Sequence, residues 1–280
     1  MEIWLARFSG EGNGGAEVTA IARAAEELGY AGVALSDHVA LPKLQTALHP
    51  IQKIPYDPEM PNPEPITTTA AMAAVTSTLR FMTYAYVMGM REPFSVAKHA
   101  GALADLSDGR FALGITPGWQ LDEIALLGHD PTTRGKRFGE ALDVIQGLWQ
   151  NDLFSYAGTH YHFENVGLCP RPATPPDILV GGHSMASIRR AAQQAGWIGM
   201  NHPLDELTDM LGTLDELANG QARKYVIPAG ELSDELLTQF EGLGIDGIVV
   251  MPWPPMQPDF GPAGAKIDAM AAFAKRWITT

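Results

Sequence analysis

The chain has 280 residues, of which 46% are apolar, and a formal net charge of −13. This size suits one large domain or two small ones, and the acidic charge disfavours nonspecific binding to nucleic acid or to anionic membranes. With one cysteine, no basic N-terminal segment and no apolar run of about 18 residues, we expect a cytoplasmic protein without disulfides, signal peptide or membrane span.

Short apolar runs alternate with amphipathic segments along the chain. We expect strands at residues 2–8, 32–38, 80–88, 111–117, 177–182, 197–200, 224–227 and 247–251, and helices that include 16–28, 93–106 and 134–149. Strand–helix alternation predicts a parallel sheet. Eight such units in one chain predict an α/β fold, a (β/α)8 TIM barrel with insertions, and a doubly wound sheet is the alternative.

Three proline-rich stretches exceed what a minimal barrel needs. Residues 39–65 carry seven prolines, 151–176 contain the hairpin-like "YAGTHYHF", and 253–264 follow the last expected strand. Long loops inside a compact domain are usually functional, and barrel enzymes build their sites at the carboxyl ends of the strands. We therefore expect a single domain over residues 1–280, with insertions at about 39–65 and 151–176.

Asp37 and His38 close the second expected strand, in "VALSDHV". At a strand's carboxyl end they can point into the barrel mouth, where His38 could hydrogen-bond a redox ring or carry a proton near neutral pH. A turn capped by aspartate beside a structural histidine fits the same residues equally well.

Two further strands carry candidate pocket residues, one near its middle and one at its exit. Thr83 and Tyr84 interrupt the third apolar run and could mark a bulge against a flat ring, although an ordinary strand with mixed faces explains them too. In "GITPGW", residues 114–119, the glycines allow a close approach of the backbone to a ligand, and Trp119 could wall a pocket. A tight strand exit with a core tryptophan is the alternative.

The stretch "DILVGGHSMASIRRAA", residues 177–192, joins a short strand to a helix. Its turn is Gly181, Gly182, His183 and Ser184. Free amides at a helix N-terminus lie at the positive end of the helix dipole and bind anions such as phosphate. Glycines also make plain turns, so the pattern alone is a weak signal.

Other chemistries find little support in the residues. Barrel metallohydrolases usually place a histidine pair on the first strand, whereas the first strand here reads "WLARF" and the pair His160 and His162 lies on an expected hairpin. We therefore expect no catalytic metal. Gly-x-Ser-x-Gly and dinucleotide-binding motifs are absent, and Cys169 precedes Pro170 in an expected loop.

Five blocks occur in the order found in the bacterial luciferase-like monooxygenase family. They are "AEELGYAGVALSDHV" (25–39), "LADLSDGRFALGITPGW" (103–119), "RGKRFGEALDVIQGLW" (134–149), "PRPATPPDILVGGHSMASIRRAA" (170–192) and "LGIDGIVVMP" (243–252). The chain resembles this family over nearly its whole length, apart from the loop after the second strand. The resemblance implies a (β/α)8 barrel that binds flavin mononucleotide (FMN) or the deazaflavin coenzyme F420 at its carboxyl mouth, and by family analogy a homodimer.

The resemblance also assigns the site residues. Gly181, Gly182, His183 and Ser184 correspond to the cradle of the cofactor phosphate. Thr116, Pro117 and Gly118 fall where the family lines the ring or the ribityl chain. Tyr84 and Ala85 fall near a bulge under the ring, which often contains a non-proline cis peptide.

The "SDH" of the second strand resembles the F420 branch, whereas flavin luciferase relatives more often show Glu-His-His. We therefore expect an oxidoreductase that transfers hydride between F420 and a small organic substrate. His38 would orient the ring or donate a proton, Asp37 would fix the His38 tautomer or contact the ring, and Trp119 with Tyr84 would wall the substrate. The alternatives are an FMN-dependent monooxygenase, in which reduced flavin activates oxygen, and a redox-inactive flavin-binding barrel.

Two residue-level points qualify this expectation. Trp119 stands where the sugar-phosphate dehydrogenases of the F420 branch carry a glutamate acid, so the resemblance does not imply their substrate. The anionic tail of F420 would need cations, for which Lys43, Lys53, Arg91 and Arg134 are candidates; they are equally ordinary surface residues.

Overall fold

The computed structural model describes residues 1–7, 14–48, 56–200, 202–253 and 262–278. Nine parallel strand segments form one sheet: β1 (Glu2–Arg7), β2 (Gly32–Leu35), β3 (Arg80–Thr83), β4 (Tyr86–Val87), β5 (Phe111–Thr116), β8 (Asp177–Gly181), β9 (Gly196–Met200), β10 (Arg223–Ile227) and β11 (Gly247–Val250). Their order is β3-β2-β1-β11-β10-β9-β8-β5-β4, and β3 also pairs with β5, which closes the ring. The predicted TIM barrel of eight parallel strands, with β3 and β4 sharing one place, is confirmed.

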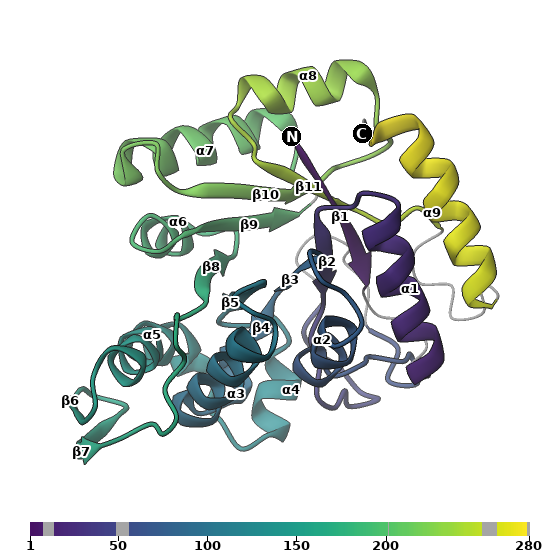
Figure 1. The fold of residues 1–280 in the computed structure, drawn as a ribbon. Helices are drawn as coiled ribbons and strands as arrows, with labels where there is room; N and C mark the ends of the chain where they lie inside the picture. The colour runs from purple at the N-terminus through teal and green to yellow at the C-terminus, as the bar shows by residue number, and fades with distance from the viewer. Residues whose placement is uncertain (8–13, 49–55, 201, 254–261, 279–280) are drawn as a thin grey trace.

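Helices surround this barrel (Figure 1). They are α1 (Gly15–Glu27), α2 (Pro65–Ala73), α3 (Pro93–Leu106), α4 (Leu121–Leu126), α5 (Arg134–Gln150), α6 (Met185–Ala191), α7 (Leu204–Ala218), α8 (Asp234–Gly242) and α9 (Ala263–Trp277). Short 3₁₀ turns occupy Met88–Met90 and Pro131–Thr133. Among the described residues, no helix has both the length and the apolar character that a membrane crossing requires.

Alternation along each strand divides the apolar core into two layers. On β1, Trp4 and Ala6 belong to the cluster inside the barrel, whereas Ile3 and Leu5 pack with the surrounding helices. The inner cluster also includes Tyr84 and Tyr225, so bulky rings close the barrel interior. Among the described residues, the barrel interior is therefore packed with side chains.

The expected third strand, 80–88, is wrong as a continuous element. It breaks into β3 and β4 around residues 84 and 85, whose peptide bond is cis. The Tyr84 side chain points inward, and its hydroxyl donates to the carbonyl oxygens of Gly199 and Tyr225. Thr83 and Tyr84, which interrupt the apolar run, lie at this break, but an ordinary strand with mixed faces explains the same residues.

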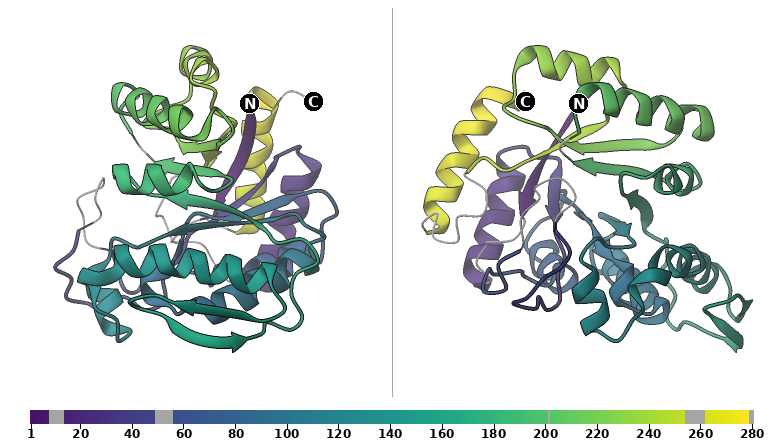
Figure 2. Two further views of the ribbon diagram at one scale, coloured as in Figure 1. Left: turned by 90° about the vertical axis from the view of Figure 1, so that its left-hand side faces the viewer. Right: turned by 180° about the vertical axis from the view of Figure 1, so that it is seen from behind.

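The insertion at 151–176 contains the expected hairpin. β6 (Phe154–Ala157) and β7 (His162–Val166) pair antiparallel and lie beside α5, outside the barrel (Figure 2). Phe154 packs against Gly147 of α5, where a Cβ would come within 2.3 Å of its ring. The hairpin thus covers a helix and lies apart from the barrel mouth. Most of the expected loop after β11, residues 254–261, lies outside the described residues.

Candidate functional site

A cavity of about 350 Å³ lies at the carboxyl ends of β2, β5, β8 and β9. Its wall includes every site residue expected from the sequence: Asp37, His38, Tyr84, Ala85, Thr116, Pro117, Gly118, Trp119, Gly181, Gly182, His183 and Ser184. Pockets of this size suit small ligands and cofactors. The structure therefore gathers residues that lie far apart in the sequence around one space.

The turn between β8 and α6 forms one side of this cavity. Gly182 has φ +132°, and a Cβ there would lie 2.5 Å from the Ser187 hydroxyl oxygen, so the conformation and the available space both require glycine. Ser184 is the N-cap of α6, and its hydroxyl accepts from the Ser187 amide at 3.2 Å. Backbone and hydroxyl groups thus line this side without bulk, which suits an oxyanion.

The break after β3 forms the floor. Ala85 lines the cavity, and the carbonyl of Thr83 lies so close to β5 that a Cβ on Gly114 would come within 1.9 Å of it. Burial raises the pKa of the Tyr84 hydroxyl well above its usual range. Tyr84 therefore keeps its proton, and its hydrogen bonds tie the floor to β9 and β10, which are not paired with β3 or β4.

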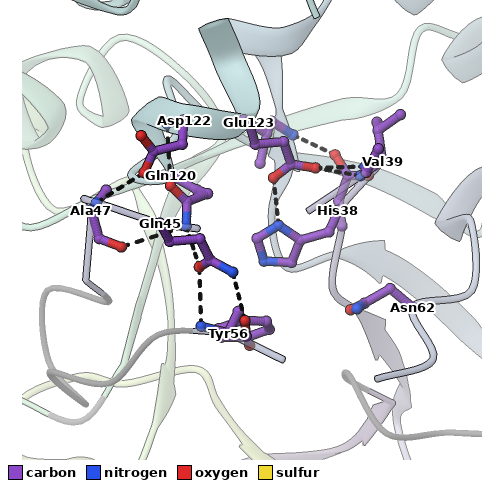
Figure 3. Close-up of polar contacts among 12 residues, drawn as sticks. His38, Val39, Gln45, Ala47, Tyr56, Asn62, Gln120, Asp122 and Glu123 are labelled. Carbon is purple, nitrogen blue, oxygen red and sulfur yellow. Dashed lines mark hydrogen bonds and ion pairs between the residues drawn. The ribbon is translucent and has the colours of Figure 1, made fainter. Parts of the chain in front are cut away.

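His38 is paired with a carboxylate that the sequence analysis did not single out. Its Nδ1 lies 2.7 Å from Oε2 of Glu123, at the start of α4, and the two side chains are only 7% and 1% exposed. The other carboxylate oxygen, Oε1, accepts from the amides of Val39 at 2.6 Å and Ala40 at 3.0 Å. Figure 3 shows Glu123 between the His38 ring and the backbone that follows it.

Asp37 does not orient His38, so this part of its expected role is wrong. Its Oδ2 lies 2.7 Å from Nη1 of Arg91 and accepts from the amide of Val87 at 2.8 Å, while Oδ1 lies 2.9 Å from Nη2 of Arg91. Both oxygens are therefore engaged away from the imidazole. Arg91 is likewise held in this pair and is not a surface cation available to a cofactor tail.

Aromatic rings surround His38 on the cavity side. Tyr56 lies with its ring centroid 4.8 Å from that of His38, and Trp119 stands edge-on at 5.8 Å. Tyr56 and Trp119 are themselves 5.6 Å apart. The imidazole thus sits in a largely apolar corner, which limits water around it.

Residues 45–47, which also hold the backbone of Tyr56, are docked onto the start of α4 (Figure 3). Asp122 accepts from the amides of Thr46 at 2.6 Å and Ala47 at 3.0 Å. Gln45 bonds the backbone of Tyr56 through both ends of its amide, and its oxygen accepts from Gln120 at 2.6 Å. Through Tyr56, the 39–65 insertion reaches the cavity wall.

Two histidines stand beside the glycine turn. Nδ1 of His183 lies 2.7 Å from Nε2 of His202. Burial, reinforced by the His202 ring, lowers the pKa of His183 to about 4, so His183 is neutral at physiological pH. Among the other cations expected near a cofactor, Arg134 lines the cavity, Lys43 does not, and Lys53 lies outside the described residues.

The match to a family model decides the family. The model of the luciferase-like monooxygenase domain matches residues 4–229. The chain belongs to the luciferase-like monooxygenase family.

Two curated members show the range of these luciferase-like relatives. An uncharacterized protein of Mycobacterium tuberculosis is 32% identical over 275 residues, covering 92% of this chain and 93% of its own length. An FMNH2-dependent dimethylsulfone monooxygenase of Pseudomonas fluorescens is also 32% identical, over 143 residues, which are 49% of this chain and 38% of that protein.

Solved structures carry the same luciferase-like fold. The monooxygenase RslO1 of Streptomyces bottropensis superposes with a TM-score of 0.78 at 19% identity and covers 99% of both chains. An F420-dependent secondary alcohol dehydrogenase superposes with a TM-score of 0.68 at 17% identity. The superposition covers 81% of this chain and 68% of the dehydrogenase chain.

In this luciferase-like barrel, Glu123 and Tyr56 are two residues beside His38 that the sequence analysis missed. Glu123 follows Asp122 in the first turn of a helix, where acids are common because they complement the helix dipole. Tyr56 lies in a proline-rich loop without periodicity. The insertion's length was the only sequence signal for Tyr56.

Proposed function

We propose that the protein is an oxidoreductase that binds coenzyme F420 in the cavity and transfers hydride between it and a small organic substrate. One observation carries the proposal: a single cavity of about 350 Å³ is bordered by the glycine turn before α6, by the break after β3 and by His38. Barrel enzymes place their chemistry at this end of the strands.

The cavity wall divides into parts that suit the parts of such a cofactor. Gly181, Gly182, His183 and Ser184 would hold the phosphate, because Gly182 leaves space that a Cβ would fill. Backbone at Ala85 and at 116–118 would support the ring and the ribityl chain, and Arg134 would add a positive charge. Bound there, the deazaflavin supplies the hydride chemistry, while the protein supplies orientation and a dry site.

His38 is the titratable side chain best placed to meet the reacting groups. It lines the cavity, lies at the carboxyl end of the β2 unit and is held by Glu123. We propose that it orients the ring or moves a proton to or from the substrate. Tyr56 and Trp119 would wall the substrate and keep water from the imidazole. A contact between Asp37 and the ring stays a prediction.

An FMN-dependent monooxygenase is the second candidate, favoured by the FMNH2-dependent relative that shares 32% identity over half of this chain. The Asp-His pair favours F420 instead, by resemblance to that branch. A barrel that binds flavin without turnover is a third possibility.

Fluorescence titration of the purified protein with oxidised and reduced F420 and FMN separates these candidates. We expect saturable F420 binding that is tighter than FMN binding. Tighter binding of FMN, with oxygen consumption when the bound FMN is reduced, would identify FMN as the cofactor in place of F420. Binding of neither compound would overturn the proposal. Full turnover by a His38→Ala variant would remove the role assigned to His38.

A further inference from the structure

The Glu123 carboxylate uses both of its oxygens inside the protein. Oε1 faces two backbone amides, at 2.6 Å and 3.0 Å, and amides can only donate. Oε2 faces Nδ1 of His38 at 2.7 Å. With the side chain 1% exposed, the protein itself supplies these three contacts.

For an ionised Glu123, this arrangement sets which ring nitrogen of His38 carries hydrogen. An ionised carboxylate has no proton to donate, so Nδ1 must be the donor in their hydrogen bond. In the neutral imidazole, Nε2 is then the unprotonated nitrogen. The ring lines the cavity, and the described residues include no hydrogen-bond partner for Nε2.

We propose that Glu123 is a positioning residue that fixes His38 in the Nδ1–H tautomer and so presents Nε2 to the cavity as an acceptor. What Nε2 meets there rests on the proposed function: it would be a donor group of the substrate or cofactor, a hydroxyl or a ring N–H. When that group gives up its proton to Nε2, the imidazolium formed stays beside a buried carboxylate that stabilises it.

Glu123→Gln is a sharp test because it preserves shape. The amide oxygen of glutamine can still accept from Val39 and Ala40, while its NH2 group must donate to Nδ1 of His38. The substitution therefore keeps the loop anchored and reverses the tautomer, so that Nε2 gains the hydrogen.

The experiment is nitrogen NMR of the full-length protein with ¹⁵N-labelled histidine. Resonances that vanish in a His38→Ala variant belong to His38, and the pH is raised until they stop moving, so that the neutral ring is observed. We expect Nδ1 protonated in the wild type and Nε2 protonated in Glu123→Gln. A wild-type ring protonated at Nε2, or the same tautomer in both proteins, would overturn the proposal.

Asp122→Asn is the matched control. Asp122 lies on the same helix and binds the same loop through the Thr46 and Ala47 amides, with no contact to His38. We expect its His38 spectrum to equal that of the wild type, and a switch like that of Glu123→Gln would count against a specific role of Glu123. The wild-type spectrum decides the tautomer even if a variant fails to fold.

Cofactor titration of the same samples keeps the two proposals apart. If F420 and FMN both fail to bind while His38 shows the expected tautomers, the proposed function fails and the role of Glu123 stands. If a cofactor binds and the tautomers differ from expectation, the reverse holds.

Discussion

Asp37 and Arg91 form a two-point ion pair under the rim of the cavity, with oxygen–nitrogen distances of 2.7 Å and 2.9 Å. The Asp37 side chain is fully buried, and the Arg91 guanidinium lies over the Tyr86 ring at 3.9 Å. Burial raises the pKa of Asp37 by more than the charge of Arg91 lowers it. Burial lowers the pKa of Arg91, but the charge of Asp37 outweighs this effect, so the pKa of Arg91 is raised. The pair joins the residues after β2 to those after β4.

Replacing Arg91 by methionine should destabilise the protein strongly. The change leaves the Asp37 carboxylate buried without its counter-ion, a loss of about 3–5 kcal/mol in the free energy of unfolding. Urea unfolding followed by tryptophan fluorescence measures it. Arg171→Ala, which removes the outer pair with Asp152, is the control, with about 0–1 kcal/mol expected because Asp152 is 90% exposed. Equal losses in the two variants would contradict a structural role for the inner pair.

Gly182→Ala should weaken binding of any cofactor that carries a phosphate. The added Cβ meets the Ser187 hydroxyl at 2.5 Å on a backbone with φ +132°, so the turn must move. We expect about a tenfold loss of FMN affinity and little change for riboflavin, which lacks the phosphate. Gly212→Ala is the control, since it lies inside α7 with nothing within 4 Å and should stabilise the helix by about 0.5–1 kcal/mol. Equal losses for FMN and riboflavin would argue against a phosphate at this turn.

Local patterns in the sequence predicted the parts of the site that are themselves local. The turn at 181–184 and the exits of β2 and β5 follow from apolar runs that end in glycine or polar residues. The break at 84–85 needed the family resemblance, because Thr83 and Tyr84 fit an ordinary strand as well as a bulge.

The long-range partners could not be predicted. His38 meets Glu123 across 85 positions, and Asp37 meets Arg91 across 54. Which acid faces which base depends on how far each loop extends past its strand, and hydrophobic periodicity carries no information on that. The adjacent Asp37 was therefore the natural but incorrect choice for the partner of His38.

Asp122→Ala should release the first part of the 39–65 insertion from α4. Its carboxylate binds two loop amides and the Thr46 hydroxyl, and the hydrogen bond from the Ala47 amide is the largest factor lowering its pKa. We expect faster proteolytic cleavage within residues 39–65, with the unfolding midpoint little changed. Asp130→Ala, which removes contacts within its own turn to Thr132, is the control. Cleavage at the wild-type rate would show that Gln45 and Gln120 suffice to hold the loop.

Glu26 should stabilise the protein in a pH-dependent way. Burial raises its pKa, but hydrogen bonds from residues 77–79 outweigh burial and lower the pKa from 4.5 to about 2. Because the folded-state pKa lies below the unfolded one, the stabilisation is complete above about pH 4.5 and is lost as the pH falls towards 2. Glu26→Gln should therefore be less stable than the wild type at pH 7, by a difference that disappears near pH 2.

Unfolding midpoints of Glu26→Gln measured across this pH range check the prediction. Glu27→Gln, at the exposed neighbouring position, should show no such trend. A stability difference for Glu26→Gln that stays constant from pH 7 to pH 2 would mean that the hydrogen bonds do not depend on the charge.

A crystal structure of the protein with F420 or FMN tests the central claim most directly. We predict the cofactor phosphate beside residues 181–184, the ring against Ala85, and the reacting face of the ring turned towards His38. A phosphate bound elsewhere, or a cavity that stays without cofactor at saturating concentration, would contradict the account.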